Sequence, residues 1–354
     1  MKKLSFLLAL VLTLSLLAGC AGTPVVYYSD CTCPTGSHVP QNTRPLTEGA
    51  LKTGLYIAAN AADSVSAGEK DGEAKFDVTV AAVLVDDNGV IQDCIIDSIG
   101  ASVKFNTSGA FTSDLTAAVL TKNELGDSYN MKTYGGAIAE WYEQAAALAE
   151  FAVGKTVEEL KNGAVDESGY APDGSDLRSS ATIYLGGYVA AIEAAVASAR
   201  HLGAEAGDTL KLAVISTVRD SVAPTAEKDG TAQLDSDVTA LTVRGDAVSS
   251  CVIDSLQGKV NFNGSGALTS DVSAPLQTKN QLGENYGMKA WGKAIAEWNE
   301  QAASFAAYVT GKTRDEIVNI AVDEGTKPTE ADLKTSVTIA VGGFQVLITK
   351  ALDQ

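Results

Sequence analysis

Thr121-Lys-Asn-Glu-Leu-Gly126 returns almost unchanged as Thr278-Lys-Asn-Gln-Leu-Gly283, 157 residues further along the chain. The same offset relates Ala-Ile-Ala-Glu-Trp at 137–141 to the identical run at 294–298. Long matches at one constant offset are the sequence signature of an internal repeat. The chain is therefore one domain written twice, and a site proposed in one copy should be sought in the other.

Upstream of this stretch, each copy begins with extended segments. In copy one, Lys75 to Val85 is dense in β-branched residues, Asp87-Asn88-Gly89 is a turn signal, and Val90 to Ser98 is extended again. A third extended segment at 102–106 has its counterpart at 259–263. These segments predict an antiparallel meander in each copy.

Helical signals follow the strands. A stripe of apolar residues at spacings of three and four predicts a helix, formed by Ile138, Trp141, Tyr142, Ala145, Leu148 and Ala152, with Glu140, Glu143 and Gln144 expected on its other side. Gly154 is expected to end this helix in a left-handed conformation. Thr156-Val-Glu-Glu159 and Thr313-Arg-Asp-Glu316 have the capping-box pattern.

A helix is also expected to close each copy. Its predicted buried face comprises Tyr188, Ile192, Ala195 and Val196 in copy one, and Phe344, Ile348, Ala351 and Leu352 in copy two. Strands grouped before helices predict an α+β fold, with two tandem homologous domains that each hold an antiparallel sheet followed by helices. Copy one spans 49–202 and copy two spans 207–354. The short connection between them predicts that the copies touch.

The N-terminus has the pattern of a lipoprotein signal peptide at 1–19. Lys2 and Lys3 precede an apolar run that is too short to span a membrane, and Leu17-Ala-Gly-Cys20 resembles the lipobox of bacterial lipoproteins. That resemblance implies acylation of Cys20 and anchoring to membrane lipid on the extracytoplasmic face of the cell membrane. Residues 20–48, rich in Pro, Thr, Ser and Gly, are expected to form a flexible tether.

Composition narrows the classes of function. A net charge of −18 argues against binding of nucleic acid, which requires clustered Lys and Arg. The two histidines, His38 and His201, lie outside the repeated blocks, so imidazole catalysis and multi-His metal sites are not expected. Cys94 and Cys251 occupy equivalent positions in strand-like runs and are expected to be buried structural thiols.

The most informative stretch lies just before each closing helix. Copy one reads Asp176-Leu-Arg-Ser-Ser-Ala-Thr182, and copy two reads Asp332-Leu-Lys-Thr-Ser-Val-Thr338. We call these the copy-one motif and the copy-two motif. They resemble the flavinylation motif of extracytoplasmic FMN-binding domains, in which a transferase esterifies the FMN phosphate onto the last threonine. The turn in Val85-Asp-Asp-Asn-Gly-Val-Ile91 is similar to that family's opening turn.

The resemblance implies covalent FMN on Thr182 and Thr338, with no other cofactor. Asp176 and Asp332 take the acidic positions of the motif, and Ser179 and Thr335 take its hydroxyl positions. It also implies a flavin transferase and redox partners, with electrons relayed between the two flavins. The sequence departs from the family where Ser180 and Ser336 replace a glycine, which would reach positive φ without strain, and where Val337 replaces an alanine. An ordinary helix start would use the same residue types.

Other repeated residues leave two interpretations open. An aromatic wall for a flavin ring is available from Tyr184, Tyr188 and Trp141 in copy one and from Phe344, Trp291 and Trp298 in copy two, although such residues usually form core. Glu140 with Glu143, and Glu297 with Glu300, are carboxylate pairs that usually lie on a solvated face. Several polar residues are the same in both copies, and they could either line a pocket or form turns and helix caps. They are Asp97 and Asp254, Asn106 and Asn263, 112–114 and 269–271, and Lys122 and Lys279.

The sequence shows no Ser-His-Asp set, phosphate loop, zinc spacing or EF-hand loop, so a self-contained enzyme is not expected. The leading interpretation is a membrane-anchored lipoprotein that carries FMN in extracellular electron transfer. The alternative is a non-catalytic surface lipoprotein that binds a ligand or partner between its repeats.

Overall fold

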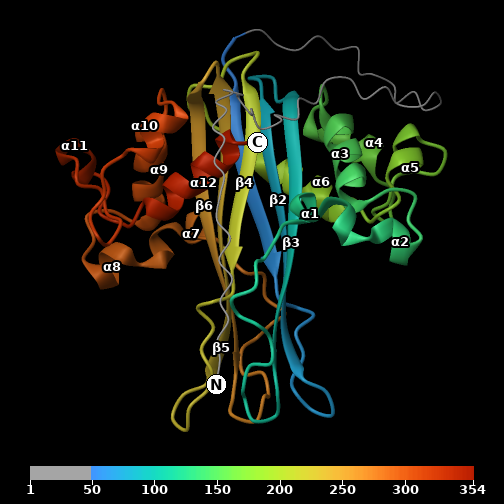
Figure 1. The fold of residues 1–354 in the computed structure, drawn as a ribbon. Helices are drawn as coiled ribbons and strands as arrows, with labels where there is room; N and C mark the ends of the chain where they lie inside the picture. The colour runs from blue at the N-terminus through green and yellow to red at the C-terminus, as the bar shows by residue number, and fades with distance from the viewer. Residues whose placement is uncertain (1–48) are drawn as a thin grey trace, which may run out of the picture. The chain divides into compact units, whose positions relative to one another are not determined.

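The computed structural model describes residues 49–354. The predicted signal peptide, Cys20, the tether with Cys31 and Cys33, and His38 lie outside the described residues. Within the described part each copy is a three-stranded antiparallel sheet followed by helices, so the predicted α+β class is confirmed. The strands are β1 Lys52–Asn60, β2 Gly72–Val85 and β3 Ile91–Phe105 in copy one, and β4 Thr209–Thr217, β5 Gly230–Arg244 and β6 Ala247–Phe262 in copy two (Figure 1).

The order of strands in each sheet is β1-β2-β3 and β4-β5-β6, a meander as predicted. The assignment of its third strand was wrong. The segment at 102–106 continues β3, because Gly100 pairs with Asp77 and keeps the ladder unbroken. The third strand is instead β1, whose buried residues Leu55, Ile57 and Ala59 alternate with half-buried Tyr56 and Ala58. Because the alternate residues are apolar as well, the sequence carries no clear polar alternation to mark this strand.

The sheets use both of their faces. In β2, Val78 and Val80 are buried in a core shared with strands of copy two, whereas Ala81 and Val83 are buried against copy-one helices. Copy two is built in the same way. The result is four layers in the order helices, sheet, sheet, helices, and Figure 1 shows the two helical groups on opposite sides of the strands. The two copies therefore touch, as their short connection predicted.

Copy one holds α1 Lys122–Leu125, the 3-10 helix η1 Gly126–Tyr129, α2 Met131–Gly135, α3 Trp141–Ala152, α4 Val157–Ala164, α5 Asp176–Ser180 and α6 Gly186–Ser198. Copy two repeats them as α7 Lys279–Leu282, η2 Gly283–Tyr286, α8 Met288–Gly292, α9 Trp298–Val309, α10 Arg314–Val318, α11 Ala331–Lys334 and α12 Gly342–Leu352. The capping boxes at Thr156 and Thr313 are confirmed, and so is the positive φ of Gly154.

Two expected helical faces need correction. Ile138 lies before α3 and is exposed, while Glu140 and Gln144, expected at the surface, are buried. Glu140 is buried because its carboxylate accepts the backbone N–H groups of Met131 and Lys132, at 2.7 and 3.1 Å. Glu297 repeats this with Met288 and Lys289.

The closing helices differ from expectation more mildly. In α6, Val189 and Ala191 are buried together with Ile192 and Ala195, whereas Tyr188 and Val196 are half-buried. In α12, three of the predicted residues are buried and Leu352 is half-buried.

Each copy also reaches across to the outer strand of the other. The backbone N–H of Leu276, after β6, donates to Ala59 in β1 at 2.9 Å, and Val119, after β3, bridges Ser216 in β4. Such contacts cover sheet edges that would otherwise be free to pair with another chain. Near the ends of β3 and β6, Phe105 stacks on Phe262 with ring centroids 3.9 Å apart. The shared core is therefore closed at its margins by residues from both copies.

Candidate functional site

The two motifs occupy the same place in both copies. The copy-one motif begins with α5 and reaches Thr182 in the short segment before α6, and the copy-two motif reaches Thr338 before α12. The residue before each threonine, Ala181 or Val337, is fully buried. Thr182 itself is half-buried and Thr338 is exposed. Each threonine therefore follows a fixed anchor and lies outside the hydrophobic core.

A buried glutamine holds each threonine. The Oε1 atom of Gln144, in α3, accepts the backbone N–H of Thr182 at 2.8 Å, its hydroxyl at 3.3 Å, and the N–H of Ile183 at 3.1 Å. Gln301 accepts the N–H and hydroxyl of Thr338 at 2.8 and 3.1 Å. Because both glutamines have no exposed surface, the segment bearing the threonine is fixed to α3 or α9.

The serines that replace the family's glycine do not strain the backbone. Ser180 is the last residue of α5, and Ser336 follows α11. Among the described residues, the non-glycine residues with positive φ are Asn130, Lys293 and Thr326, so neither serine needs the freedom that only glycine has.

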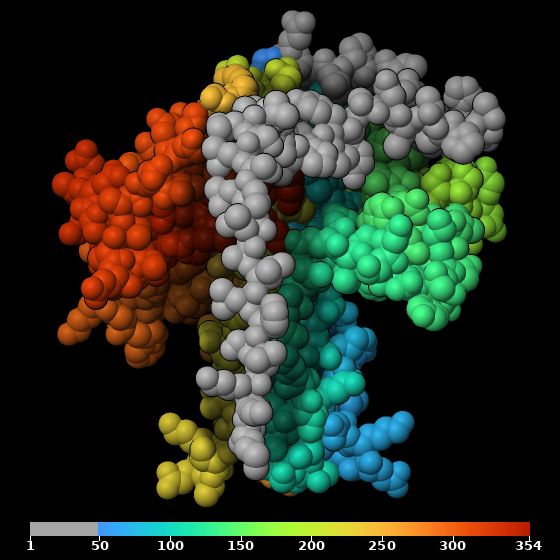
Figure 2. All heavy atoms as spheres, viewed as in Figure 1, coloured from blue at the N-terminus to red at the C-terminus, as the bar shows by residue number. Residues whose placement is uncertain are grey.

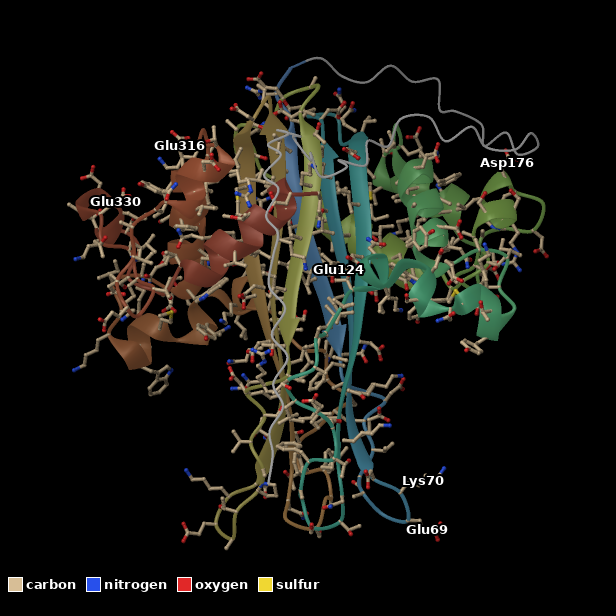
Figure 3. The ribbon with its side chains drawn as sticks, viewed as in Figure 1. Glu69, Lys70, Glu124, Asp176, Glu316 and Glu330 are labelled. Carbon is tan, nitrogen blue, oxygen red and sulfur yellow. The ribbon has the colours of Figure 1, made fainter. Side chains whose placement is uncertain are left out.

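The other motif residues serve their own short helices. The Ser179 hydroxyl donates to the Asp176 carbonyl at 2.6 Å, and the Thr335 hydroxyl donates to the Asp332 carbonyl at the same distance. Both aspartates are exposed. Figure 3 shows Asp176 at the outer edge of the copy-one helices. The structure thus joins each threonine to a glutamine that sequence reasoning missed, and leaves the predicted acidic positions at the surface.

Copy one carries an additional cluster beside its motif. Tyr184, two residues after Thr182, is 54% exposed and meets Tyr170 edge to face, with centroids 5.7 Å apart. The Arg178 guanidinium lies over the Tyr170 ring, 5.9 Å from its centroid. Its Nη1 atom is buried and has no hydrogen-bond partner within the described residues. A buried guanidinium nitrogen without an acceptor fits an anionic group such as a phosphate.

The equivalent cluster is absent from copy two, where the sequence has Lys327 and Ala340 in place of Tyr170 and Tyr184. Thr326 at this point adopts φ 58° and packs where a side chain on Gly342 would lie. The two copies are therefore unequal around their threonines, and copy one has the richer surroundings.

Half of the proposed aromatic wall is core. Trp141, Trp298 and Phe344 are buried, and Trp141 Nε1 donates to the Tyr188 hydroxyl at 3.0 Å. Trp291 of the proposed wall lies on α8 and is 88% exposed, and Tyr134 at the equivalent position on α2 is 85% exposed. They occupy equivalent positions, so the recurrence of an aromatic residue there was the available sequence signal.

The repeated polar residues act mainly in turns and caps. Asn106 Oδ1 accepts the N–H of Ser108 at 2.9 Å, and Asp114 Oδ1 accepts that of Thr116 at 2.8 Å. Asp97 and its counterpart Asp254 are buried, and burial raises the pKa of each carboxyl to about 6. Each accepts two backbone N–H groups, which supports a local structural role. The expectation of buried free thiols at Cys94 and Cys251 is confirmed.

The two motifs lie far apart. Figure 2 shows the helices of the two copies as separate masses on opposite sides of the strands, and in Figure 3 Asp176 and Glu330, which precedes α11, are at opposite edges. Among residues 49–354 no helix has the length and apolar character needed to cross a membrane. In comparisons with known proteins, no protein-family model, no curated protein and no solved structure matches this chain.

Proposed function

We propose that this chain is an extracytoplasmic flavin carrier, anchored through an acylated Cys20, that bears FMN esterified to Thr182 and to Thr338. The observation that carries the proposal is the placement of both hydroxyls outside the core, on a fixed segment immediately before the closing helix. A threonine packed inside the hydrophobic core would be inaccessible to a transferase.

The residues around Thr182 suit such an attachment. Gln144 fixes the backbone on both sides of the acceptor oxygen, so the hydroxyl is presented in one orientation. Arg178 Nε lies 3.6 Å from Asp173 Oδ1, while its Nη1 nitrogen has no hydrogen-bond partner within the described residues and could bond to a phosphate oxygen. The exposed Tyr184 ring offers a flat surface for an aromatic group. When bound, the flavin supplies the electron-transfer chemistry, and the protein supplies attachment and orientation.

The layered fold bears on how electrons would move. Two sheets and two helical layers separate the motifs, and each adjacent pair of layers lies about 10 Å apart. The two acceptor positions are therefore separated by about 30 Å or more on this estimate. We propose that Thr182 and Thr338 would each hold a flavin for a separate external redox partner, rather than form a relay within the chain.

Co-expression with an active flavin transferase tests the proposal. The intact mass should increase by two units of FMN less water, with flavin fluorescence in the gel band. Thr182→Ala and Thr338→Ala should each lose one increment. Thr116→Ala is the matched control, because that threonine is exposed and lies outside both motifs. An unmodified mass beside a transferase that labels a known acceptor protein would refute the proposal.

A further inference from the structure

A pocket of about 670 Å³ lies between the two copies, and none of its lining residues belongs to either motif. Its walls come from β1 and α6 of copy one and from β6 and α9 of copy two. The lining is mainly aliphatic, with Leu55, Ile57, Ala194, Val252, Ala303 and Ala306 among its residues. We call it the interface pocket. Its volume falls within the range of small-molecule sites in proteins, about 300–1,000 Å³.

The internal repeat predicts a second, equivalent pocket at the other interface between the copies. Different side chains bridge the helices and strands at that interface. On the interface-pocket side, Gln281 Nε2 donates to the Ile57 carbonyl in β1 at 2.8 Å. The equivalent residue on the other side is Glu124, which cannot donate when ionised. There Lys350 of α12 donates to the Val214 carbonyl in β4 at 2.6 Å and forms an ion pair with Glu124. Figure 3 shows Glu124 near the centre of the molecule.

The residue of α6 equivalent to Lys350 is Ala194. The interface pocket therefore lacks the long side chain that crosses the corresponding interface. On that other side, β3 and α3 line one pocket of about 480 Å³, while Glu124 and Lys350 line a different pocket of about 800 Å³. Within the described residues, one duplicated interface thus has a pocket lined together by β1, α6, β6 and α9, whereas the other has two separate pockets.

Most polar groups around the interface pocket are satisfied by the protein. Asn280 Nδ2 donates to the Ile253 carbonyl, Ser198 Oγ donates to the Leu55 carbonyl, and Arg200 Nη1 donates to the Ala199 carbonyl, each at 2.9 Å. Asp254 accepts the backbone N–H groups of its neighbours. In contrast, Asn299 Oδ1, in α9, is buried and has no hydrogen-bond partner within the described residues.

We propose that the interface pocket binds a neutral, mainly apolar small molecule that donates one N–H or O–H hydrogen bond to Asn299 Oδ1. The aliphatic lining favours an apolar body, because a charged group would lose its hydration against aliphatic side chains. A buried acceptor without a hydrogen-bond partner costs free energy. A ligand that donates a hydrogen bond to this oxygen should therefore bind more tightly than one that cannot. This site is independent of flavin attachment.

The test uses the full mature chain, expressed without a flavin transferase, and two fluorescent probes. 2-Phenylindole has an N–H donor, and 1-methyl-2-phenylindole is the matched probe without it. Fluorescence titration should show 2-phenylindole binding at least about fivefold more tightly, the effect expected from one buried hydrogen bond. Asn299→Ala should abolish this preference while still binding both probes.

A second variant copies the closed interface. Ala194→Lys combined with Gln281→Glu should rebuild the lysine–glutamate pair seen at Lys350 and Glu124, and should weaken 2-phenylindole at least about tenfold. Thermal unfolding of the double variant checks that it remains folded. The reverse pair, Lys350→Ala with Glu124→Gln, alters the other interface and should leave the affinity for the probe unchanged.

Equal affinity of the wild-type chain for the two probes, or undiminished binding by the Ala194→Lys/Gln281→Glu variant, would overturn the proposal. So would the absence of binding by both probes up to their solubility limits. Each of these outcomes is separable from failure of the flavin proposal, because no flavin is present in the experiment.

Discussion

Thr182 donates both its backbone N–H and its hydroxyl to Gln144 Oε1, across 38 residues of sequence, at 2.8 and 3.3 Å. The same pair of bonds joins Thr338 to Gln301. The duplicated chain has kept this connection although the residues around it have diverged. This contact fixes the proposed acceptor segment to α3 in copy one and to α9 in copy two.

Replacing the glutamine should loosen that segment. Gln144→Leu leaves the donors of Thr182 and Ile183 without their buried acceptor and should lower the free energy of unfolding by about 1–3 kcal/mol. Urea denaturation followed by circular dichroism measures the change. Glu150→Gln, on the exposed side of the same helix, is the control and should change stability by less than about 0.5 kcal/mol. An equal effect of the two substitutions would contradict the anchoring role.

Stability should depend on pH through Asp97. Burial raises the pKa of this carboxyl to about 6, so the folded chain holds its proton at a pH where the unfolded chain has lost it. The contribution to stability is therefore full below about pH 4 and is lost as the pH rises through about 6, a change of about 3 kcal/mol.

Asp97→Asn keeps an acceptor oxygen but cannot titrate. The substitution should remove the Asp97 contribution to the decline in unfolding free energy between about pH 4.5 and about pH 7. Asp114→Asn is the comparison, because hydrogen bonds from Thr116 lower the pKa of the exposed Asp114 carboxyl. If Asp97→Asn retains the full wild-type slope, the buried carboxyl is not its source.

The duplicated interfaces should be partly interchangeable. Lys350→Ala removes the donor to the Val214 carbonyl and should destabilise the chain by about 1–3 kcal/mol. Adding Glu124→Gln should restore part of this loss, since the equivalent Gln281 donates directly to Ile57. Urea denaturation of the single and double variants gives the comparison. A double variant no more stable than Lys350→Ala would show that the two interfaces are not equivalent.

The two core thiols should resist alkylation in the folded chain. Burial raises the pKa of the Cys251 thiol to about 12 and also raises that of Cys94. Iodoacetamide treatment followed by peptide mapping should label neither residue until urea unfolds the chain. Ser108→Cys provides an exposed thiol as a positive control. Labelling of Cys94 or Cys251 at the rate of that control would contradict their burial.

The sequence predicted those features that short-range patterns encode. The capping boxes at Thr156 and Thr313 depend on residues only three positions apart. The positive φ at position 154 depends only on that residue being glycine. Both features could therefore be predicted from the local sequence. The meander followed from β-branched runs separated by a turn. The position of the motifs before the closing helices was likewise a matter of order along the chain.

Features that depend on contacts distant in the sequence were missed. Gln144 was expected at the surface, because nothing near it indicates that it accepts bonds from Thr182. Glu140 was expected in solvent, because its partners belong to another short helix. The interface pocket depends on which of two duplicated positions, Ala194 or Lys350, carries a long side chain, and only the packed structure shows what that side chain crosses.

The most direct test of the central claim is to locate the adduct by tandem mass spectrometry after co-expression with a flavin transferase. Tryptic cleavage at Arg178 and Arg200 gives a peptide from Ser179 to Arg200, and cleavage at Lys334 and Lys350 gives one from Thr335 to Lys350. We predict FMN phosphodiesters on Thr182 in the first peptide and on Thr338 in the second. Unmodified peptides, or an adduct on a different residue, would contradict the account.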